Sequence, residues 1–202
     1  MIHLKKQQTT NSWLRLLLVS KLILGACLWA PLTAQAKEEK PELYEQIYLS
    51  ESQALKTVFG TLKVKSRSLT LSEDKKTELQ RLLHRKIPEA NFTLFEGYEG
   101  NKLKRYAFIL EEKGKHFPIT FIVALNPNAS VNQVAVMVYR ERRGDGVKRG
   151  RFLSQFKDKN STSAIEINKD IVHLTGSTIS SWSIAAGVRK AVVLLNELVI
   201  KQ

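Results

Sequence analysis

A hydroxyl-rich segment, Thr-Gly-Ser-Thr-Ile-Ser-Ser at residues 175–181, is the part of the chain best suited to chemistry. It directly precedes an apolar stretch with helical periodicity, Ser181 to Leu198, and so lies at the N-terminus of a predicted helix. The first turn of a helix leaves backbone N–H groups without partners and carries the positive end of the helix dipole. Gly176 lets the backbone approach a ligand closely. The segment therefore predicts an anion site, and specifically a phosphate site.

Other residue types that carry chemistry are scattered along the chain. His84, His116 and His173 lack the spacing of metal ligands. No catalytic triad, paired carboxylate, Walker loop or dinucleotide-binding glycine motif occurs at convincing spacing. We therefore expect no catalytic residue and no metal site. Trp182 directly follows the hydroxyl-rich segment, and packs either on a ligand there or in the core.

A basic stretch that contains glycines, Arg140 to Arg151, precedes this segment. Gly144 and Gly146 either bring the stretch close to a ligand or form a plain hairpin turn. Its basic residues face an anionic ligand, dock an acidic protein, or form a solvated surface. They are Arg140, Arg142, Arg143, Lys148, Arg149 and Arg151.

The first 36 residues predict a secretory signal peptide. Basic residues flank and interrupt an apolar stretch from Trp13 to Leu32, and no acid occurs before Glu38. The small residues of Ala34-Gln35-Ala36 predict cleavage after Ala36.

Two alternatives for the N-terminus remain open. In the first, the apolar stretch is an uncleaved membrane anchor, although Lys21 interrupts it. In the second, Leu24-Gly25-Ala26-Cys27 is a lipobox and Cys27 carries a lipid.

Charge and cysteine content restrict the classes of function. The net charge is +13, and loss of residues 1–36, which carry four positive and no negative charges, leaves +9. A basic surface suits nucleic acid, anionic lipid or an acidic protein, but export argues against nucleic acid. Cys27 is the only cysteine, so the processed chain has no disulfide and no cysteine nucleophile. Any redox chemistry must then come from a bound cofactor.

The remaining pattern predicts helices first and strands afterwards. Ser50 begins a capping box before a short helix that ends near Gly60, and Ser72 opens a second helix that Pro88 ends. Strands are predicted at 92–95, 105–110, 117–125 and 131–139, and a short helical segment at 152–156. Strands joined by short turns and followed by a helix indicate an α+β domain with an antiparallel sheet. We divide the chain into 1–36, a helical region 37–90 and a main domain 91–202.

The C-terminal part of the chain resembles the FMN-binding domain family. Its members include the G component of Rnf-type electron-transport complexes, the C component of the sodium-translocating NADH:quinone reductase and stand-alone exported flavoproteins. The family signature Ser/Thr-Gly-Ala-Thr-x-x-Ser/Thr is matched by residues 175–181, and its Phe-Leu-x-Gln-Phe segment by Phe152 to Phe156. Val188 to Val192 is similar to the helix that follows. The resemblance covers residues 131–198, with similar strands from Phe92, and is closest to the exported members.

The resemblance implies that the Thr178 hydroxyl is esterified to the phosphate of one FMN per chain. A separate flavin transferase, with FAD as donor, makes this bond in the family. A threonine hydroxyl is a weak nucleophile without an adjacent base, and residues 175–181 contain no histidine or carboxylate, which agrees with an external enzyme. The other cofactor-binding residues that the resemblance implies are Thr175, Gly176, Ser177, Ser180 and Ser181, with Ser181 as the helix cap.

Three features depart from the family pattern. Val172 stands where most members have Asp or Asn, which bears on recognition by the transferase. Ser177 replaces the usual alanine. The family segment His-x-Glu-Thr-Pro-Gly-x-Gly appears as Tyr-Arg-Glu-Arg-Arg-Gly-Asp-Gly at 139–146, so the contacts of the isoalloxazine ring are not assigned.

These inferences predict an exported electron-transfer flavoprotein at the periplasmic or other extracytoplasmic face of the inner membrane. It would pass electrons between a membrane donor and a membrane or periplasmic acceptor. An electron carrier is favoured over an enzyme because no acid–base pair is evident, although a flavin-dependent reductase is compatible with chemistry on the flavin. The rival hypothesis, motivated by Val172 and the altered loop, is an exported binding or regulatory module with noncovalent flavin or none.

Overall fold

The computed structural model describes residues 44–201. The predicted signal peptide, its two alternatives and the leader up to residue 43 lie outside this range. The helices and strands are β1 (Gln46–Ile47), α2 (Glu51–Phe59), β2 (Lys63–Thr70), α3 (Glu73–Leu83), β3 (Asn91–Glu99), β4 (Lys102–Lys113), β5 (Pro118–Leu125), β6 (Val131–Tyr139), α4 (Gly150–Leu153) and α5 (Thr178–Leu195). The 3-10 turns η1 (Asp145–Lys148) and η2 (Ser154–Phe156) flank α4, and the π-helical turn η3 (Asn196–Ile200) continues α5.

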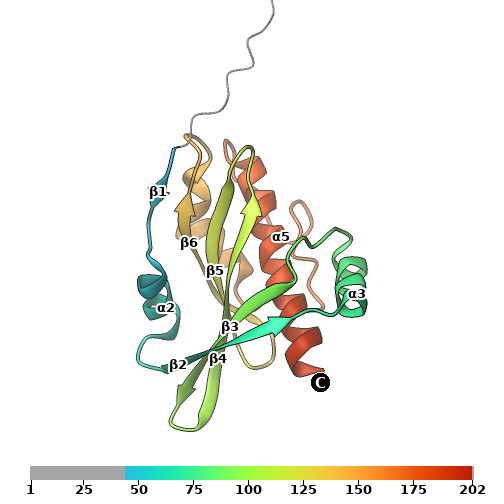
Figure 1. The fold of residues 1–202 in the computed structure, drawn as a ribbon. Coiled ribbons are helices and arrows are strands. Elements are labelled where there is room, and N and C mark those ends of the chain that lie inside the picture. Colours follow the sequence, from blue (N-terminus) through green and yellow to red (C-terminus); the bar gives the residue numbers. More distant parts are fainter. Residues whose placement is uncertain (1–43, 202) are drawn as a thin grey trace, which may run out of the picture. The chain divides into compact units, whose positions relative to one another are not determined.

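Six strands form one antiparallel sheet in the order β1-β6-β5-β4-β3-β2 (Figure 1). β3 to β6 follow one another as a meander, each strand pairing with the next. β2 pairs along its whole length with β3, from Lys63 opposite Tyr98 to Thr70 opposite Asn91. β1 adds two residues at the other edge, beside β6. The predicted α+β class with an antiparallel sheet is confirmed.

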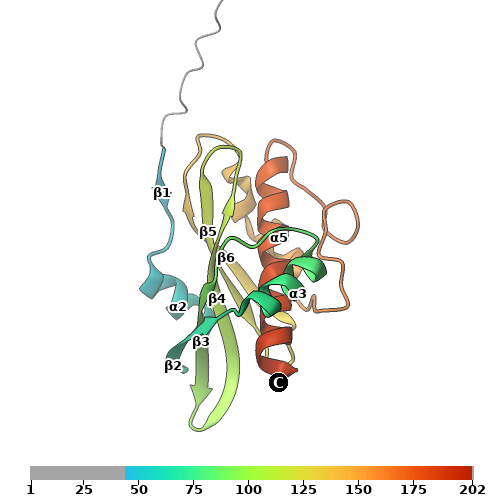
Figure 2. The same ribbon diagram turned by 45° about the vertical axis from the view of Figure 1, so that its right-hand side comes forward.

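Helices cover both faces of the sheet, with α2 on one side and α3 and α5 on the other (Figure 2). β5 shows the consequence. Its alternate residues from Ile119 to Leu125 belong to the larger core cluster beneath α5, whereas Ile122 and Ala124 pack in the smaller cluster with α2. Because side chains alternate between the faces of a strand, a strand covered on both faces is apolar along nearly its whole length.

Most predicted elements are confirmed, with differences at the end of α3, at β1 and β2, and at the start of α5. Ser50 forms the capping box with Gln53, and α2 ends at Gly60. α3 ends at His84, in the left-handed conformation, and so before Pro88. The pattern did not predict β1 or β2, and residues 37–90 therefore contribute strands as well as helices. β2 is an edge strand in which only Leu69 is buried, so no alternation of apolar residues marks it.

The last helix, α5, begins at Thr178 rather than at Ser181, with Ser177 at the N-cap position. The first turn of the helix is therefore made by the hydroxyl-rich segment itself. Within residues 44–201, no helix combines the length and the apolar character needed to cross a bilayer.

Candidate functional site

The turn that leads into α5 leaves its first amides without a side-chain cap. Gly176 has a φ of 78°, which glycine adopts without strain, and the Ser177 amide donates to the Leu174 carbonyl over 2.9 Å. The Ser177 side chain makes no capping hydrogen bond. The first-turn N–H groups and the positive end of the helix dipole thus stand at a surface lined by residues 176–180, which is the arrangement that an anion requires.

The hydroxyl groups of this turn differ in accessibility. Thr178 is exposed at the first position of α5. Ser180 is buried, and its Oγ lies 2.8 Å from the Tyr139 hydroxyl. Within residues 177–181, Thr178 is therefore the one hydroxyl residue whose side chain an external enzyme can reach.

Ser181 does not cap the helix, and that expectation is wrong. It is the fourth residue of α5 and is fully buried. Its hydroxyl donates to the Ser177 carbonyl over 2.9 Å and accepts from the Leu174 amide over 3.2 Å. Because the helix begins three residues earlier than expected, Ser181 stabilises the turn from inside the fold.

Gly144 of the basic stretch lies directly against the start of α5. A Cβ built there would lie 2.5 Å from the Tyr139 hydroxyl and 2.9 Å from Ser180 Oγ. The Tyr139 hydroxyl also donates to the Arg143 carbonyl over 2.7 Å. Burial raises the pKa of this phenol, which keeps it a hydrogen-bond donor. β6, the basic stretch and α5 therefore meet at Tyr139.

Gly146 makes a second close approach, since a Cβ there would lie 3.0 Å from Ser177 Oγ. The structure thus supports the interpretation in which Gly144 and Gly146 bring this stretch against the hydroxyl-rich segment. The plain hairpin turn is not what these glycines form: Gly144 caps the 3-10 turn η1 in a left-handed conformation with a φ of 93°.

Two adjoining hollows, here called the glycine-loop hollows, lie between the basic stretch and the start of α5. Their volumes are about 300 and 420 Å³. Both are lined by Arg143, Gly144, Gly176 and Ser177. The first is also lined by Lys115, Glu141, Thr178, Ile179 and Ser180, and the second by Arg142, Asp145, Gly146, Arg149, Leu174 and Thr175. Five of the six predicted cofactor-binding residues meet here, and Ser181 is the exception.

Positive charge predominates around the glycine-loop hollows. The lining has four basic and two acidic residues. A hydrogen bond from Lys148 over 2.8 Å holds the pKa of Asp145 below its ordinary value. The Glu141 carboxylate accepts from the His116 amide over 2.8 Å. The acids are thus occupied by neighbouring donors, and the surplus of basic side chains suits a phosphate.

Some basic residues of this stretch line the site, and others form ion pairs elsewhere. Arg142, Arg143 and Arg149 line the hollows, whereas Arg140 forms ion pairs with Glu45 and Glu111. The sequence did not predict that Lys115 lines the site. The turn after β4, which contains Lys115, lies beside the end of β6 only because β5 pairs with β6.

The segment Phe152 to Phe156 anchors the chain just before the hydroxyl-rich segment. The buried rings of Phe152 and Phe156 contact each other edge to face, with centroids 5.4 Å apart. The Gln155 amide donates to the Val172 carbonyl over 3.1 Å and accepts from the Val172 amide over 2.8 Å. The Val172 side chain is 70% exposed. Gln155 therefore fixes the backbone at this position independently of the side chain there.

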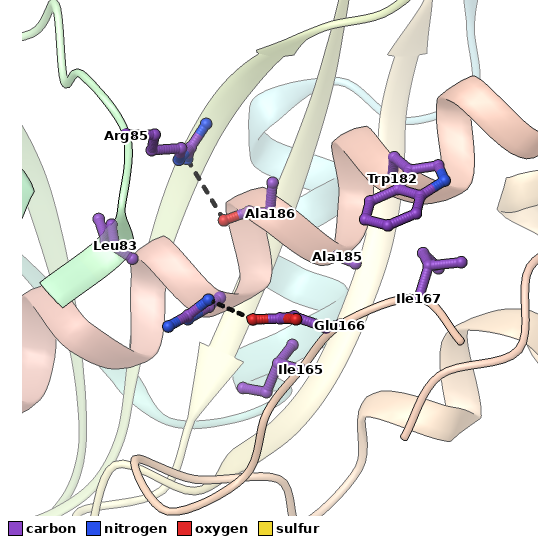
Figure 3. A pocket seen from close by; sticks show the side chains of 9 residues that line it. Leu83, Arg85, Ile165, Glu166, Ile167, Trp182, Ala185 and Ala186 are labelled. Carbon is purple, nitrogen blue, oxygen red and sulfur yellow. Dashed lines mark hydrogen bonds and ion pairs between the residues drawn. The ribbon is translucent and has the colours of Figure 1, made fainter. Parts of the chain in front are cut away.

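A third hollow, here called the Trp182 hollow, lies further along α5 and has a volume of about 170 Å³ (Figure 3). The end of α3, residues 165–167 and one face of α5 form its walls. The lining residues are Leu83, Arg85, Ile165, Glu166, Ile167, Trp182, Ala185, Ala186 and Arg189. Trp182 is 49% exposed, which excludes the alternative that it packs in the core.

The histidines stand apart from the lining of all three hollows. His84 ends α3, and His173 Nδ1 lies 3.3 Å from Asn168 Oδ1. In the part of the chain that the structure describes, no group of three or more His, Cys, Asp or Glu side chains is placed to hold a metal ion.

Two comparisons with known proteins bear on this site. A family model, the FMN-binding domain, matches residues 114–193, a range that includes every residue lining the glycine-loop hollows. The chain is also 30% identical over 105 residues to the G component of the proton-translocating ferredoxin:NAD(+) oxidoreductase complex of Clostridium ljungdahlii. That match covers 48% of this chain and 57% of the relative, so the chain spans little more than half the length of that curated relative.

Proposed function

We propose that this chain, whose residues 114–193 match the model of the FMN-binding domain, is an exported electron-transfer flavoprotein with one FMN esterified to Thr178. When bound, the flavin supplies transfer of one or two electrons, and the protein positions it and tunes its potential. One observation carries the point of attachment. Thr178 is the exposed hydroxyl residue at the start of α5, whereas Ser180 and Ser181 are buried and hydrogen-bonded within the fold.

The residues around Thr178 fit the phosphate end of FMN. The first amides of α5 have no side-chain cap, and Lys115, Arg143 and Arg149 supply positive charge nearby. A Cβ at Gly176 would meet nothing within 4 Å, so the backbone there borders open space. Thr175, Gly176 and Ser177 would hold the phosphate and the ribityl chain.

The surroundings of Thr178 agree with attachment by a separate transferase. In that reaction the Thr178 oxygen forms a bond to the FMN phosphorus as the phosphoanhydride bond of FAD breaks, and AMP leaves. The hydroxyl proton must pass to a base. Glu141, the carboxylate of the same hollow, already accepts hydrogen bonds from the His116 and Phe117 amides. We therefore assign the base to the transferase.

The partners and the location follow from two further arguments. The relative in Clostridium ljungdahlii is named as part of a ferredoxin:NAD(+) oxidoreductase complex, so we propose a membrane redox complex as the electron partner of this chain. The predicted signal peptide supports a location of the flavin on the extracytoplasmic side. A covalent bond is useful there because a dissociated flavin would be lost.

Intact mass spectrometry of the full chain, co-expressed with a flavin transferase, tests this proposal. The wild-type protein should be yellow and carry the mass increment of one FMN, and Thr178→Val should have neither. Thr61→Val is the matched control, because Thr61 is also exposed but lines neither glycine-loop hollow, and it should keep the flavin. The same mass reports whether the chain is cleaved after Ala36.

Denaturation separates the proposal from the rival binding module. Yellow colour that stays with the denatured chain supports the covalent carrier. Colour released on denaturation, an absence of flavin from the wild type, or flavin retained covalently by Thr178→Val would contradict it.

A further inference from the structure

The outer edge of β6 is occupied by other parts of the chain near both ends and is open between them. Near its start, Val131 exchanges two backbone hydrogen bonds with the segment 158–159, over 2.7 and 2.8 Å. Near its end, the Met137 carbonyl accepts from the amides of residues 48–49, and β1 pairs beyond that point (Figure 1). In the described part of the chain, no backbone hydrogen bond reaches the outer edge of residues 132–136. We call this open edge the β6 gap.

The β6 gap presents its backbone groups in regular strand geometry. Residues 133–136 lie opposite residues 124–121 of β5, and the two register shifts of this pair fall outside that span. In an antiparallel pair, alternate residues turn their N–H and C=O groups away from the partner strand. The gap therefore offers hydrogen bonds to a further strand, over a length of about 17 Å for its residues.

A fourth hollow, here called the β6 hollow, lies along this gap and has a volume of about 400 Å³. Residues 132–135 form one wall, and the other is formed by Gly150, Leu153, Ser154 and Lys157. A Cβ at Gly150 would meet nothing within 4 Å, so the hollow is open at this point. Because the side chains of a strand alternate between its two faces, a strand in the gap would direct every second side chain to this hollow.

β6 lacks the charges that commonly protect an edge strand. No charged residue occurs between Val131 and Tyr139. The strand at the other edge of the sheet, β2, instead carries exposed Lys63, Lys65 and Arg67. Charged side chains, and lysine above all, blunt an edge against pairing with another strand. We therefore expect an added strand at β6 rather than at β2.

The occupied ends of the gap argue against two occupants. A second copy would bring its own β6, which is nine residues long, and that strand would collide with residues 48–49 and 158–159. The described start of this chain leads away from the gap, because β1 is antiparallel to β6 with Gln46 opposite Tyr139. A single extended peptide segment of about five residues fits between the ends. Of the described residues that line the β6 hollow, Lys157 is the one with a charge, which favours an acidic side chain in that segment.

We propose that the β6 gap is a docking site for an extended peptide segment of a partner protein, which adds a strand to the sheet and directs an acidic side chain to Lys157. Main-chain hydrogen bonds supply the affinity, and the β6 hollow supplies the preference for side chains. This inference goes beyond the proposed function and does not depend on the presence of FMN. Tyr139, at the end of the same strand, contacts Ser180 of the candidate site, so the docked partner lies along the strand that leads to that site.

Fluorescence anisotropy of a labelled peptide, Val-Thr-Val-Thr-Glu, added to the purified full chain tests the proposal. Binding should saturate in the millimolar range or below. N-methylation of the alternate peptide amides that face β6 should weaken binding several-fold, because each methyl group removes a hydrogen-bond donor and blocks the approach of the strands. N-methylation of the other alternate set, which faces solvent, should leave the affinity unchanged.

Two variants test the hollow and its charge. Gly150→Leu fills the β6 hollow and should weaken binding several-fold, whereas the matched control Gly150→Ala should bind as the wild type does. Lys157→Glu should reverse the preference between this peptide and its lysine counterpart, Val-Thr-Val-Thr-Lys. Both positions are exposed, so we expect each variant to fold, and its melting temperature checks this.

NMR amide shifts locate the bound peptide, and the largest changes should fall on residues 132–136. Changes on β2 instead, equal effects of the two N-methylation patterns, or an absence of binding up to the millimolar range would overturn the site. A dimer of the chain that Gly150→Leu disrupts would overturn the choice of occupant in favour of a second copy. Because peptide binding should be the same with and without FMN, a chain that carries no FMN mass would overturn the proposed function alone.

Discussion

The Tyr139 hydroxyl lies 2.8 Å from the Ser180 hydroxyl, and this contact joins the end of β6 to the first turn of α5. The two residues are 41 positions apart, and Gly144 fits against both. The contact thus holds the basic stretch against the helix N-terminus, where Arg143 and Gly144 line both glycine-loop hollows.

Tyr139→Phe should destabilise the protein and loosen the basic stretch. It removes hydrogen bonds to Ser180 and to the Arg143 carbonyl, each with a net contribution of about 0.5–1.5 kcal/mol. We expect the free energy of unfolding, measured by urea denaturation, to fall by about 1–3 kcal/mol. Tyr106→Phe is the control, because this buried tyrosine makes no side-chain hydrogen bond within the described chain. If both variants lost the same free energy of unfolding, the contact between Tyr139 and Ser180 would not be the cause.

Gly144→Ala should be destabilising and should lower FMN loading. The φ of 93° is strained for alanine, and the new Cβ would collide with the Tyr139 and Ser180 hydroxyls. Such a backbone position costs about 1–3 kcal/mol. Gly150→Ala is the matched control, since a Cβ there meets nothing within 4 Å. Thermal denaturation and intact mass measure the two effects, and a normal melting temperature and loading in Gly144→Ala would contradict the close packing.

Gln155→Leu should lower stability by about 1–2 kcal/mol, because it removes both hydrogen bonds to the Val172 backbone. Val172→Asn restores the polar residue typical of the family at an exposed position, and should stay within about 0.5 kcal/mol of the wild type. Chemical denaturation compares the two. If Val172→Asn were the more destabilising variant, the side chain rather than Gln155 would determine the backbone there.

Glu112 should make stability depend on pH in the acid range. Burial alone raises the pKa of this carboxyl, but the Arg85 hydrogen bond and the Lys190 charge outweigh burial, so that the pKa lies below its ordinary value of 4.5. The folded state therefore binds the proton more weakly than the unfolded state. The resulting stabilisation is fully present above pH 4.5 and is lost as the pH falls through the folded-state pKa.

Glu112→Gln checks this assignment. At neutral pH it should lower the free energy of unfolding by about 3 kcal/mol, because it leaves buried Lys190 with one carboxylate fewer. The difference from the wild type should shrink as the pH falls below 4.5, measured by urea denaturation across that range. A difference that is constant with pH would show that the carboxylate charge does not supply the stabilisation.

Local sequence signals sufficed for much of the fold. Ser50 with Gln53 marks the start of α2, and the apolar run of β5 marks a strand covered on both faces. These patterns are readable because a cap or an alternation involves residues close in the chain. The polar edge strand β2 could not be predicted from the sequence, because it is a strand through its pairing with β3 and not through the pattern of its own side chains.

The candidate site, too, was predictable from the sequence only in part. The sequence by itself determined the hydroxyl-rich segment, its place at a helix N-terminus and the resemblance that points to Thr178. Only the tertiary structure decided which hydroxyls are free. It buried Ser180 and Ser181, left Thr178 exposed and turned Trp182 to an open hollow. The physical reason is that these outcomes depend on contacts with Tyr139 and Gly144, which are remote in sequence from α5 and are brought to it only by the folded chain.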